Sequence, residues 1–219
     1  MRTILAIYSK PPIPGRTKSR LAVDVGDVAA AELAAALLAD LLVMAAALPG
    51  VETQLWRPPD CDAAGFGALV PASVSHRVQV GADLGERMSH TCRTALEAEG
   101  AEHVLIVGSD CGTHEPAAIA AAIAALRTAA VVFRPAADGG YVLVGQRVWT
   151  PAVFAGPDWG AGTVMRQTRV ALAAAGLRAH ELAPTFDVDT VADLRPLALT
   201  LRAAVGHDAT RKWLTANGY

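Results

Sequence analysis

The segment Val104-Leu105-Ile106-Val107-Gly108-Ser109-Asp110 decides the fold class of this chain. Four consecutive apolar residues predict a strand that is buried on both faces, which is typical of parallel sheets with helices on either side. The carboxylate of Asp110 follows directly after this strand, where open α/β sheets bind their ligands. The segment therefore predicts an α/β fold together with a candidate functional residue.

Strand-like and helix-like segments alternate on both sides of this central strand. We expect further strands at 3–9, 52–56, 76–80, 131–133, 141–144 and 178–182, and helices at 28–48, 86–99 and 163–175, with a last helical region after Thr190. Thr113 is expected to cap a helix that has Pro116 in its first turn and runs to Leu126. Asp138-Gly139-Gly140, between two strands, predicts a turn with positive φ.

The composition of the chain fits a globular protein and excludes some partners. It has 219 residues, of which 53% are hydrophobic and 18% charged, and a formal net charge of -2. A chain of this size can bury roughly 70% of its surface, which is enough for one substantial core. We find no repeat or long linker and expect one domain over residues 1–219. The balanced charge gives no field for nucleic acid, which is not an expected partner.

The cysteines and the apolar segments indicate a cytoplasmic protein. Three cysteines without a C-x-x-C pair fit a reducing compartment. The apolar start of the chain is too short for a signal peptide. The stretch 28–48 is long enough to span a membrane, but it contains Glu32 and Asp40, and each acid costs ~2.5 to 3.5 kcal/mol near a bilayer centre. We therefore expect no membrane insertion.

A basic loop follows the first strand, with the sequence Ser9-Lys10-Pro11-Pro12-Ile13-Pro14-Gly15-Arg16-Thr17-Lys18-Ser19-Arg20-Leu21. Backbone N–H groups from Gly15 onward and the nearby cations could hold a phosphate chain. A short extended stretch would put Lys18 and Arg20 on one side. The loop has one glycine and no complete phosphate-loop motif, so a solvated basic loop is an equal alternative.

Three carboxylates are candidates for a metal site. Asp187 and Asp189 occupy alternate positions and would point the same way in an extended segment, and Asp110 could hold Mg²⁺. Oxygen ligands of this kind suit Mg²⁺ or Mn²⁺. The alternative is structural: Asp110 interacts with a helix dipole, and Asp189 starts the last helix, with Asp193 completing a capping-box-like pattern. Both interpretations can hold together.

Five segments together resemble a known family, over nearly the whole chain. They are Lys10-x-Pro12-x-Pro14-Gly15-x-x-Lys18-Ser19-Arg20-Leu21, Gln79-x-Gly81-x-Asp83-Leu84-Gly85-x-Arg87-Met88, Gly108-Ser109-Asp110-Cys111, Asp138-Gly139-Gly140-Tyr141 and Asp187-Val188-Asp189-Thr190. This set resembles the bacterial family of short, glycosyltransferase-like nucleotide-diphospho-sugar transferases, and more distantly the molybdenum-cofactor and phospholactate guanylyltransferases.

The resemblance implies a Rossmann-like GT-A fold with a mostly parallel mixed sheet, and it implies roles for particular residues. The implied nucleotide-binding residues are Ser9, Lys10, Pro14, Gly15, Lys18, Arg20, Gln79, Gly81, Asp83, Leu84 and Gly85, with Lys10, Lys18 and Arg20 at the phosphates. The implied metal ligands are Asp110, Asp187 and Asp189, and the implied catalytic residues are Lys18, Asp110 and Asp138. The transferred or acceptor group would lie near Asp138, Gly139, Gly140, Tyr141 and Trp159.

Two residues depart from the family pattern. Gly112 stands where the family usually has proline, and Ala161 replaces a usual hydroxyl residue. The second departure bears on acceptor recognition, because Ala161 lies two residues from Trp159.

The resemblance implies an enzyme that transfers a group from a nucleotide or nucleotide-sugar donor to a small-molecule acceptor, with Mg²⁺ or Mn²⁺. Charge on the departing diphosphate can be stabilised by the cation and the basic loop, without a covalent intermediate. Glycosyl transfer is the first expectation. Nucleotidyl transfer, with release of diphosphate, is the alternative, and a nucleotide-binding module without turnover is the alternative from another class.

Overall fold

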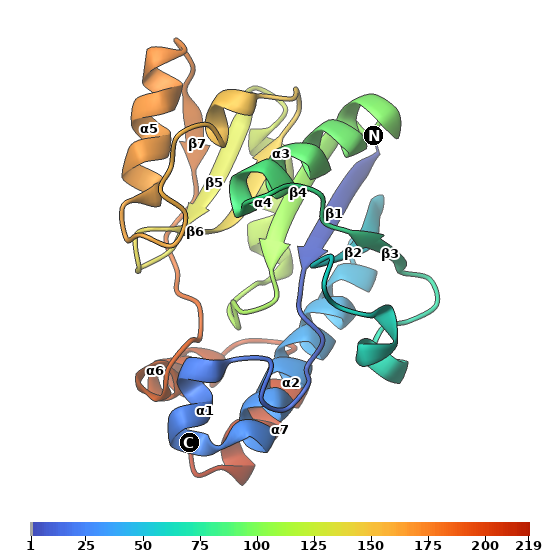
Figure 1. Cartoon of the computed structure of the whole chain (residues 1–219), viewed down its shortest axis with the longest axis vertical. Coiled ribbons are helices and arrows are strands. Elements are labelled where there is room, and N and C mark those ends of the chain that lie inside the picture. Colours follow the sequence, from blue (N-terminus) through green and yellow to red (C-terminus); the bar gives the residue numbers. More distant parts are fainter. Residues whose placement is uncertain (1) are drawn as a thin grey trace.

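The computed structural model describes residues 2–219, and these form a seven-stranded mixed sheet in the order β3-β2-β1-β4-β6-β5-β7 (Figure 1). The strands are β1 (Thr3–Tyr8), β2 (Val51–Arg57), β3 (Ser75–Val78), β4 (His103–Gly108), β5 (Val131–Pro135), β6 (Tyr141–Gln146) and β7 (Ala179–Glu181). The expected α/β fold with a mostly parallel sheet is confirmed.

The direction of β6 determines which loops meet at one edge of the sheet. β1 is parallel to β2 and β4, whereas β6 is antiparallel to both β4 and β5. β5 therefore runs the same way as β4, and the β5–β6 hairpin turns at the edge where β1 and β4 end. Gly139, in this turn, has φ +89°, as the sequence predicts. The turn thus brings Asp138 to the edge where Asp110 lies.

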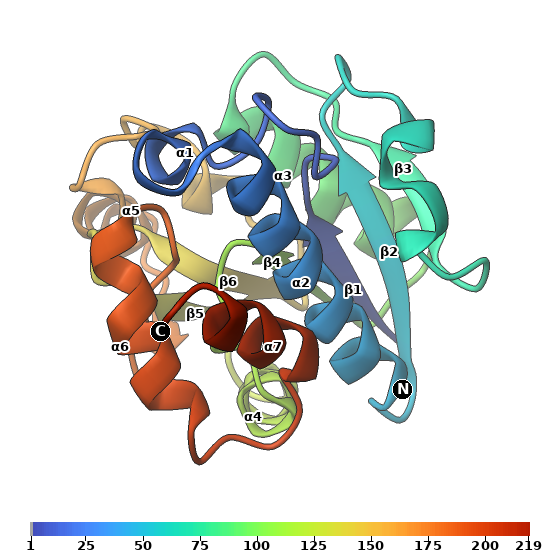
Figure 2. The same ribbon diagram turned by 90° about the horizontal axis from the view of Figure 1, so that it is seen from below.

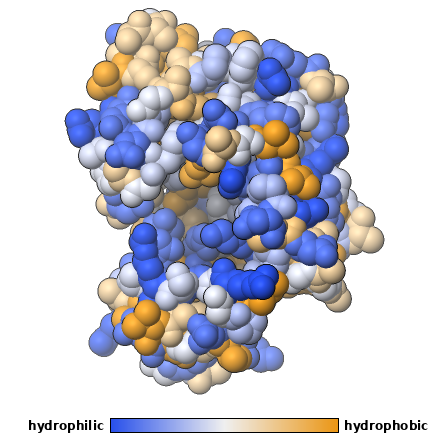
Figure 3. All heavy atoms as spheres, in the orientation of Figure 1, coloured by the Kyte–Doolittle hydropathy of each residue, from blue (hydrophilic) through white to orange (hydrophobic). Residues whose placement is uncertain are grey.

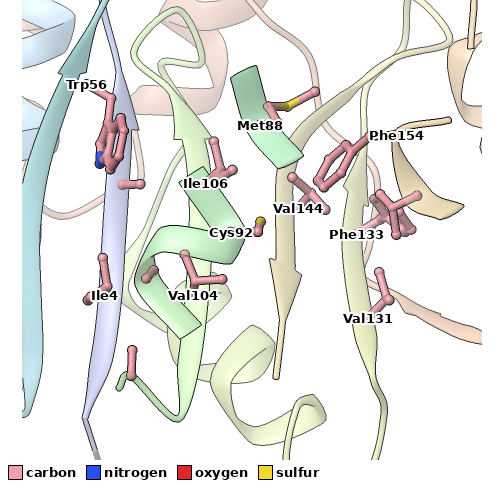
Figure 4. Close-up of a cluster of buried hydrophobic side chains, with 14 of the residues drawn as sticks. Ile4, Trp56, Met88, Cys92, Val104, Ile106, Val131, Phe133, Val144 and Phe154 are labelled. Carbon is pink, nitrogen blue, oxygen red and sulfur yellow. The ribbon is translucent and has the colours of Figure 1, made fainter. Parts of the chain in front are cut away.

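Both faces of the sheet are covered by helices. On one face, α3 (Leu84–Arg93) and α5 (Val164–Ala174) cover a core that includes Trp56, Met88, Cys92, Ile106 and Phe133 (Figure 4). On the other face, α2 (Asp27–Ala46) and α4 (Pro116–Ala125) cover a second core. Neighbouring β1 residues Ile4 and Leu5 enter different cores, and both are fully buried. This explains the continuous apolar runs in the central strands.

Three more helices pack around the N-terminal end of α2. They are α1 (Ser19–Val25), α6 (Val191–Leu201) and α7 (Asp208–Ala216), with which α2 shares a third buried cluster. Figure 2 shows α7 beside α2. The carboxylate of Asp40, on α2, accepts hydrogen bonds from the backbone N–H groups of Ala209 (3.0 Å) and Thr210 (2.8 Å). One acid of the apolar stretch therefore anchors the first turn of α7.

By length and composition, one helix among residues 2–219 is apolar enough to cross a membrane, namely α2. Half of its most apolar window is buried, and its leucines contribute to both the second and the third cluster.

The local structure differs from the sequence-based expectations at three places. α1 was not expected. The helix expected over 86–99 is α-helical only to Arg93, and the chain then forms a π-helical turn over Thr94–Ala98. The expectation that Thr113 caps α4 is wrong, because the N-cap residue is Glu115. Glu115 precedes Pro116, and the proline ring holds the residue before it in an extended conformation. Short 3₁₀ segments at Ala63–Leu69 and Pro151–Val153 complete the structure.

Candidate active site

Three adjoining pockets lie at the edge where β1 and β4 end, and the space-filling view shows a hollow bordered mainly by hydrophilic residues (Figure 3). The Gln79 pocket, about 360 Å³, is lined by Tyr8, Ser9, Lys10, Pro58, Gln79, Leu84, Arg87, Met88, Ile106, Gly108, Asp110, Tyr141, Val142 and Val144. The Lys18 pocket, about 210 Å³, is lined by Lys10, Thr17, Lys18, Ser19, Arg20, Ala34, Ser109, Asp110 and Asp189. The Trp159 pocket, about 330 Å³, is lined by Arg20, Leu84, Met88, Ala136, Asp138, Gly140, Tyr141, Trp159, Gly160, Ala161, Val164, Asp187 and Asp189.

The three pockets form one branched cleft, because each pair shares residues. Asp110 lines both the Gln79 and the Lys18 pocket. Asp189 and Arg20 line both the Lys18 and the Trp159 pocket. Tyr141 lines both the Gln79 and the Trp159 pocket. A ligand with three parts could therefore place one part in each pocket, around Asp110 and Asp189.

Lys18 is buried in the wall of the Lys18 pocket, beside Asp110. Only 2% of its side chain is exposed, and its Nζ donates to Asp110 Oδ1 (2.9 Å) and to the carbonyl oxygen of Val188 (2.6 Å). Its backbone is left-handed, with φ +48°, which a non-glycine residue adopts only at a cost. A solvated surface lysine would show neither feature.

Lys18 and Arg20 do not share one side of an extended stretch, as the sequence suggested, because α1 begins at Ser19 between them. Arg20 lies on the helix, with 76% of its side chain exposed, and its Nη1 is 3.5 Å from Asp189 Oδ2. The two cations therefore reach different carboxylates of the same cleft. Lys10 lines the cleft as well, whereas Pro14 and Gly15 form an exposed turn outside the three pockets.

The carboxylates of the cleft influence one another. Burial raises the pKa of Asp187, and the negative charges of Asp138, Asp189 and Asp110 raise it further. Burial also raises the pKa of Asp189, as does Asp110, while Lys18 and Arg20 act in the opposite direction. The cleft therefore crowds negative charge at one place. Among residues 2–219, however, no three His, Cys, Asp or Glu side chains are close enough to hold a metal ion by themselves.

Asp187 and Asp189 both line the Trp159 pocket, as alternation in an extended segment predicts. The expected capping pattern is present beside them: the carboxylate of Asp193 accepts from the backbone N–H groups of Asp189 (3.0 Å) and Thr190 (2.7 Å). The ligand and capping interpretations are compatible, because capping uses the backbone of Asp189 and leaves its side chain in the cleft.

Aromatic rings and a tight turn form the Trp159 pocket. Asp138 Oδ1 accepts from the N–H of Gly140 (2.8 Å), and Oδ2 accepts no hydrogen bond from residues 2–219. Tyr141 packs edge-on against Trp159, with ring centroids 6.3 Å apart. The Tyr141 hydroxyl is buried and has no hydrogen-bond partner among the described residues. Gly139 is outside the lining, where its backbone carbonyl accepts from Met165.

The segment from Gln79 to Gly85 contributes two residues to the cleft. Gln79 is buried, and its Nε2 donates to the carbonyl oxygen of Trp56 (2.9 Å). Leu84 lines two of the pockets. The other three predicted residues of this segment lie outside the three pockets. Gly81 borders a separate pocket beside His90. Asp83 caps α3 by accepting from the Glu86 N–H, and Gly85 is buried against Trp159.

Sequence reasoning did not single out Tyr8 and Pro58, which line the Gln79 pocket. Tyr8 is the last residue of β1, and Pro58 follows the last residue of β2. Arg87 and Met88, which end the motif that begins at Gln79, line this pocket from α3, one turn after Leu84. The signal for Tyr8 and Pro58 was their position at the carboxyl ends of parallel strands, where ligands bind in such sheets.

Comparison with protein families agrees with the fold and with the motifs. A family model described as "Uncharacterized protein conserved in bacteria (DUF2064)" matches residues 41–161. The chain belongs to the DUF2064 family. The matched region of this DUF2064 protein contains the segment from Gln79 to Met88, Asp110 and Asp138. No curated protein matches the chain.

Solved structures show how widely this fold occurs. A protein from Desulfovibrio desulfuricans G20, provisionally named a nucleotide-diphospho-sugar transferase, is 32% identical, with a TM-score of 0.92 over 99% of this chain and 96% of that chain. A CMP:2-keto-3-deoxy-manno-octonic acid synthetase in complex with CTP has 13% identity and a TM-score of 0.58, over 93% of this chain and 100% of that chain. A cytidylyltransferase from Leptospira borgpetersenii serovar Hardjo-bovis (strain JB197) has 12% identity and a TM-score of 0.57, over 99% and 95% of the two chains. The last two share the fold, which is of the GT-A-like nucleotidyltransferase type.

Proposed function

We propose that this DUF2064 protein is a metal-dependent transferase that uses a nucleotide-activated donor, and that its reaction is glycosyl transfer from a nucleotide-diphospho-sugar to a small-molecule acceptor. The observation that carries the proposal is the branched cleft, in which a polar pocket with three cations joins two other pockets at Asp110 and Asp189. The provisional name of the 32% identical relative supports the same class of reaction.

The Lys18 pocket suits the diphosphate of the donor. Lys10, Lys18 and Arg20 line it, and about 210 Å³ is enough for two phosphate groups. Phosphate oxygens would compete with Asp110 for the Lys18 ammonium and could replace Asp189 as the partner of the exposed Arg20 guanidinium. Charge-assisted hydrogen bonds of this kind are the strongest polar contacts that a protein can offer to phosphate.

The carboxylates around this pocket fit a divalent cation of the Mg²⁺ or Mn²⁺ type. All the donors are hard carboxylate oxygens. Burial and the neighbouring negative charges both raise the pKa of Asp187 and Asp189, and a positive charge would relieve the repulsion. A protein usually binds Mg²⁺ through one or two carboxylates, while phosphates and waters complete the coordination, so a set of three protein ligands is not required. Asp110 with Asp189 or Asp187 would hold the cation.

The residues of the chain then have separate tasks. A cation held by these carboxylates would supply Lewis-acid stabilisation of the leaving nucleoside diphosphate. Lys18 neutralises the same charge from a buried position, and the exposed Arg20 can add a second positive charge. Asp138 Oδ2 can accept the proton of an acceptor hydroxyl in the Trp159 pocket, and the rings of Tyr141 and Trp159 can pack against that acceptor. The Gln79 pocket would hold the nucleoside.

Nucleotidyl transfer is the second candidate, and one feature of the cleft favours it. The Gln79 and Trp159 pockets adjoin directly through Leu84, Met88 and Tyr141. An acceptor beside Trp159 could therefore approach a nucleoside phosphate without crossing the Lys18 pocket, from which diphosphate would leave.

The test is donor binding and turnover by the full chain, with a panel of nucleoside triphosphates and nucleotide-diphospho-sugars, each with and without Mg²⁺. We expect Mg²⁺-dependent binding that is about ten- to a hundredfold weaker in Asp110→Asn, because an amide is a much poorer ligand for a hard cation. Asp24→Asn, which changes an exposed acid on α1, is the matched control. Slow release of nucleoside diphosphate indicates glycosyl transfer, and release of diphosphate indicates nucleotidyl transfer.

Two outcomes would count against the proposal. If no donor of either class binds with Mg²⁺, the branched cleft is not a donor site. If donors bind but no acceptor gives a product, the protein is a nucleotide-binding module without turnover. Equal Mg²⁺ dependence in Asp110→Asn and Asp24→Asn would remove Asp110 from the metal site.

A further inference from the structure

A fourth pocket, which shares no residue with the branched cleft, lies between β5 and the C-terminal helices. It has a volume of about 320 Å³ and is lined among others by Thr113, Glu115, Arg134, Thr185, Phe186 and His207. We call it the Arg134 pocket. The segment Thr185–Asp187 separates it from the cleft: Phe186 lines the Arg134 pocket, and its neighbour Asp187 lines the Trp159 pocket.

Arg134 is a buried cation that forms no ion pair within the part of the chain that the structure describes. It is 8% exposed, and its guanidinium donates to two backbone carbonyl oxygens, those of Thr113 (3.0 Å) and Ala183 (3.4 Å). None of the ion pairs formed within residues 2–219 includes it. Buried charges in proteins are normally paired, because removal from water is costly. The carbonyl oxygens orient the guanidinium but do not neutralise it.

His207 provides a second, independent observation at the same pocket. Its φ is +60°, and Lys18 is the only other non-glycine residue with positive φ among those that the structure describes. A non-glycine residue keeps this conformation only where its surroundings enforce it, and such residues cluster at ligand sites. The backbone thus holds the His207 imidazole at the lining of the pocket that contains the unpaired guanidinium.

We propose that the Arg134 pocket is a second ligand site, which binds a compact oxyanion, a carboxylate or phosphate group, between Arg134 and His207. The planar guanidinium matches the two oxygens of either group, and the volume is in the range of small-molecule sites. The imidazole contributes a ring N–H. Glu115 lies at the same pocket with an exposed side chain, and its negative charge opposes an anion. This proposal does not depend on the function of the branched cleft.

The experiment follows the arginine Nε–Hε signals of the ¹⁵N-labelled full chain by NMR. Arg134 Nε–H is hydrogen-bonded to Ala183 and should exchange slowly enough to be seen. The signal is assigned by its loss in Arg134→Gln, or in Arg134→Lys if the first variant does not fold. Inorganic phosphate and, separately, acetate are titrated against sodium chloride at matched ionic strength. Residue-specific signals distinguish this site from Arg20 in the cleft.

We expect a saturable shift of the Arg134 signal with phosphate, with acetate or with both, and none with chloride. The dissociation constant should rise about tenfold in His207→Gly, since one hydrogen bond to a charged group is lost. That variant should fold, because glycine favours φ +60°. Glu115→Gln should lower the dissociation constant several-fold, because it removes a like charge. The proposal is overturned if neither oxyanion gives a saturable shift, if chloride gives the same shift, or if both variants bind as the wild type does.

Discussion

Gly85, in the first turn of α3, packs so closely against Trp159 that a β-carbon at position 85 would lie 2.7 Å from Cε2 of the indole. Real β-carbons do not approach a ring this closely. The contact joins α3 to the loop that carries Trp159, and so determines how wide the Trp159 pocket is. Glycine at position 85 is thus required by the wall of the pocket rather than by backbone conformation.

Gly85→Ala should therefore displace Trp159 and lower the free energy of unfolding by about 1 to 3 kcal/mol, the usual cost of overpacking. The measurement is a double-mutant cycle with Trp159→Ala, in which chemical denaturation gives the free energy of unfolding of each variant. In the Trp159→Ala background the alanine at position 85 should cost almost nothing. If it costs the same in both backgrounds, the indole does not impose the glycine.

Lys18→Gly and Lys18→Ala both remove the ammonium group. The glycine variant should nevertheless be more stable than the alanine variant by about 1 kcal/mol. The reason is the left-handed backbone of Lys18, which alanine adopts at a cost and glycine does not. Both variants should also reduce the rise in melting temperature that a nucleotide with Mg²⁺ produces, because binding and apparent stability are linked. Thermal melts with and without ligand give both quantities. Ligand-induced shifts as large as those of the wild type would exclude a phosphate role for Lys18.

Asp40→Ala should lower the free energy of unfolding by about 1 to 2 kcal/mol, as the loss of a helix cap does. For a chain of this size that corresponds to a melting temperature lower by roughly 2 to 8 °C. The physical reason is that two N–H groups in the first turn of α7 lose their acceptor. Glu32→Ala, which changes an exposed acid on the same helix, is the control and should have little effect. Equal effects would point to helix propensity or net charge instead.

His114 makes the protein less stable in mild acid. The residue is 2% exposed, and burial, assisted by Arg134, lowers the pKa of its imidazole from 6.5 to about 4. Between these values the unfolded chain binds a proton that the folded protein does not, so stability falls as the pH decreases through this window. Between about pH 7.5 and about pH 5, His114 should account for a loss of about 2 kcal/mol.

Urea denaturation at the two pH values measures this loss. In His114→Gln, whose side-chain amide can keep a hydrogen bond to the carbonyl oxygen of Gly108, the part due to His114 should disappear. A loss as large as that of the wild type would assign the acid sensitivity to other groups, such as His90 or His103, whose pKa values burial also lowers.

Most of the sheet could be predicted from sequence, because buried strands such as 104–107 carry an unmistakable apolar run. The β5–β6 turn with positive φ at Gly139 also followed from the local chemistry of Asp138-Gly139-Gly140, whereas the direction of β6 did not. α1 is difficult to predict from sequence because it is only seven residues long, begins where the basic loop ends and buries a single residue, Leu21. The cap of α4 was predicted at Thr113 because hydroxyl residues favour N-cap positions. Pro116 instead holds Glu115 in an extended conformation, so the helix begins after Glu115.

The residues of the cleft were harder to predict than the fold. Those that closely follow the carboxyl end of a strand, such as Asp110 after β4, could be found from position. The role of the Lys18 side chain as the buried partner of Asp110 and Val188 could not, since it depends on contacts across most of the chain. The same holds for Gly85 and for the pocket around Arg134, where packing between distant segments decides which atoms face a ligand.

The two partners of Lys18 also determine when its ammonium becomes buried as the protein is made. The lysine precedes Asp110 by 92 positions and Val188 by 170. Synthesis proceeds from the N-terminus, so the basic loop leaves the ribosome long before the carbonyl oxygen that it binds. A nascent chain that lacks the final segments keeps this cation hydrated, and its cleft lacks one wall. The edge that carries the branched cleft is therefore among the last parts of the molecule to be completed, and a chain truncated before Val188 would lack this wall of the cleft.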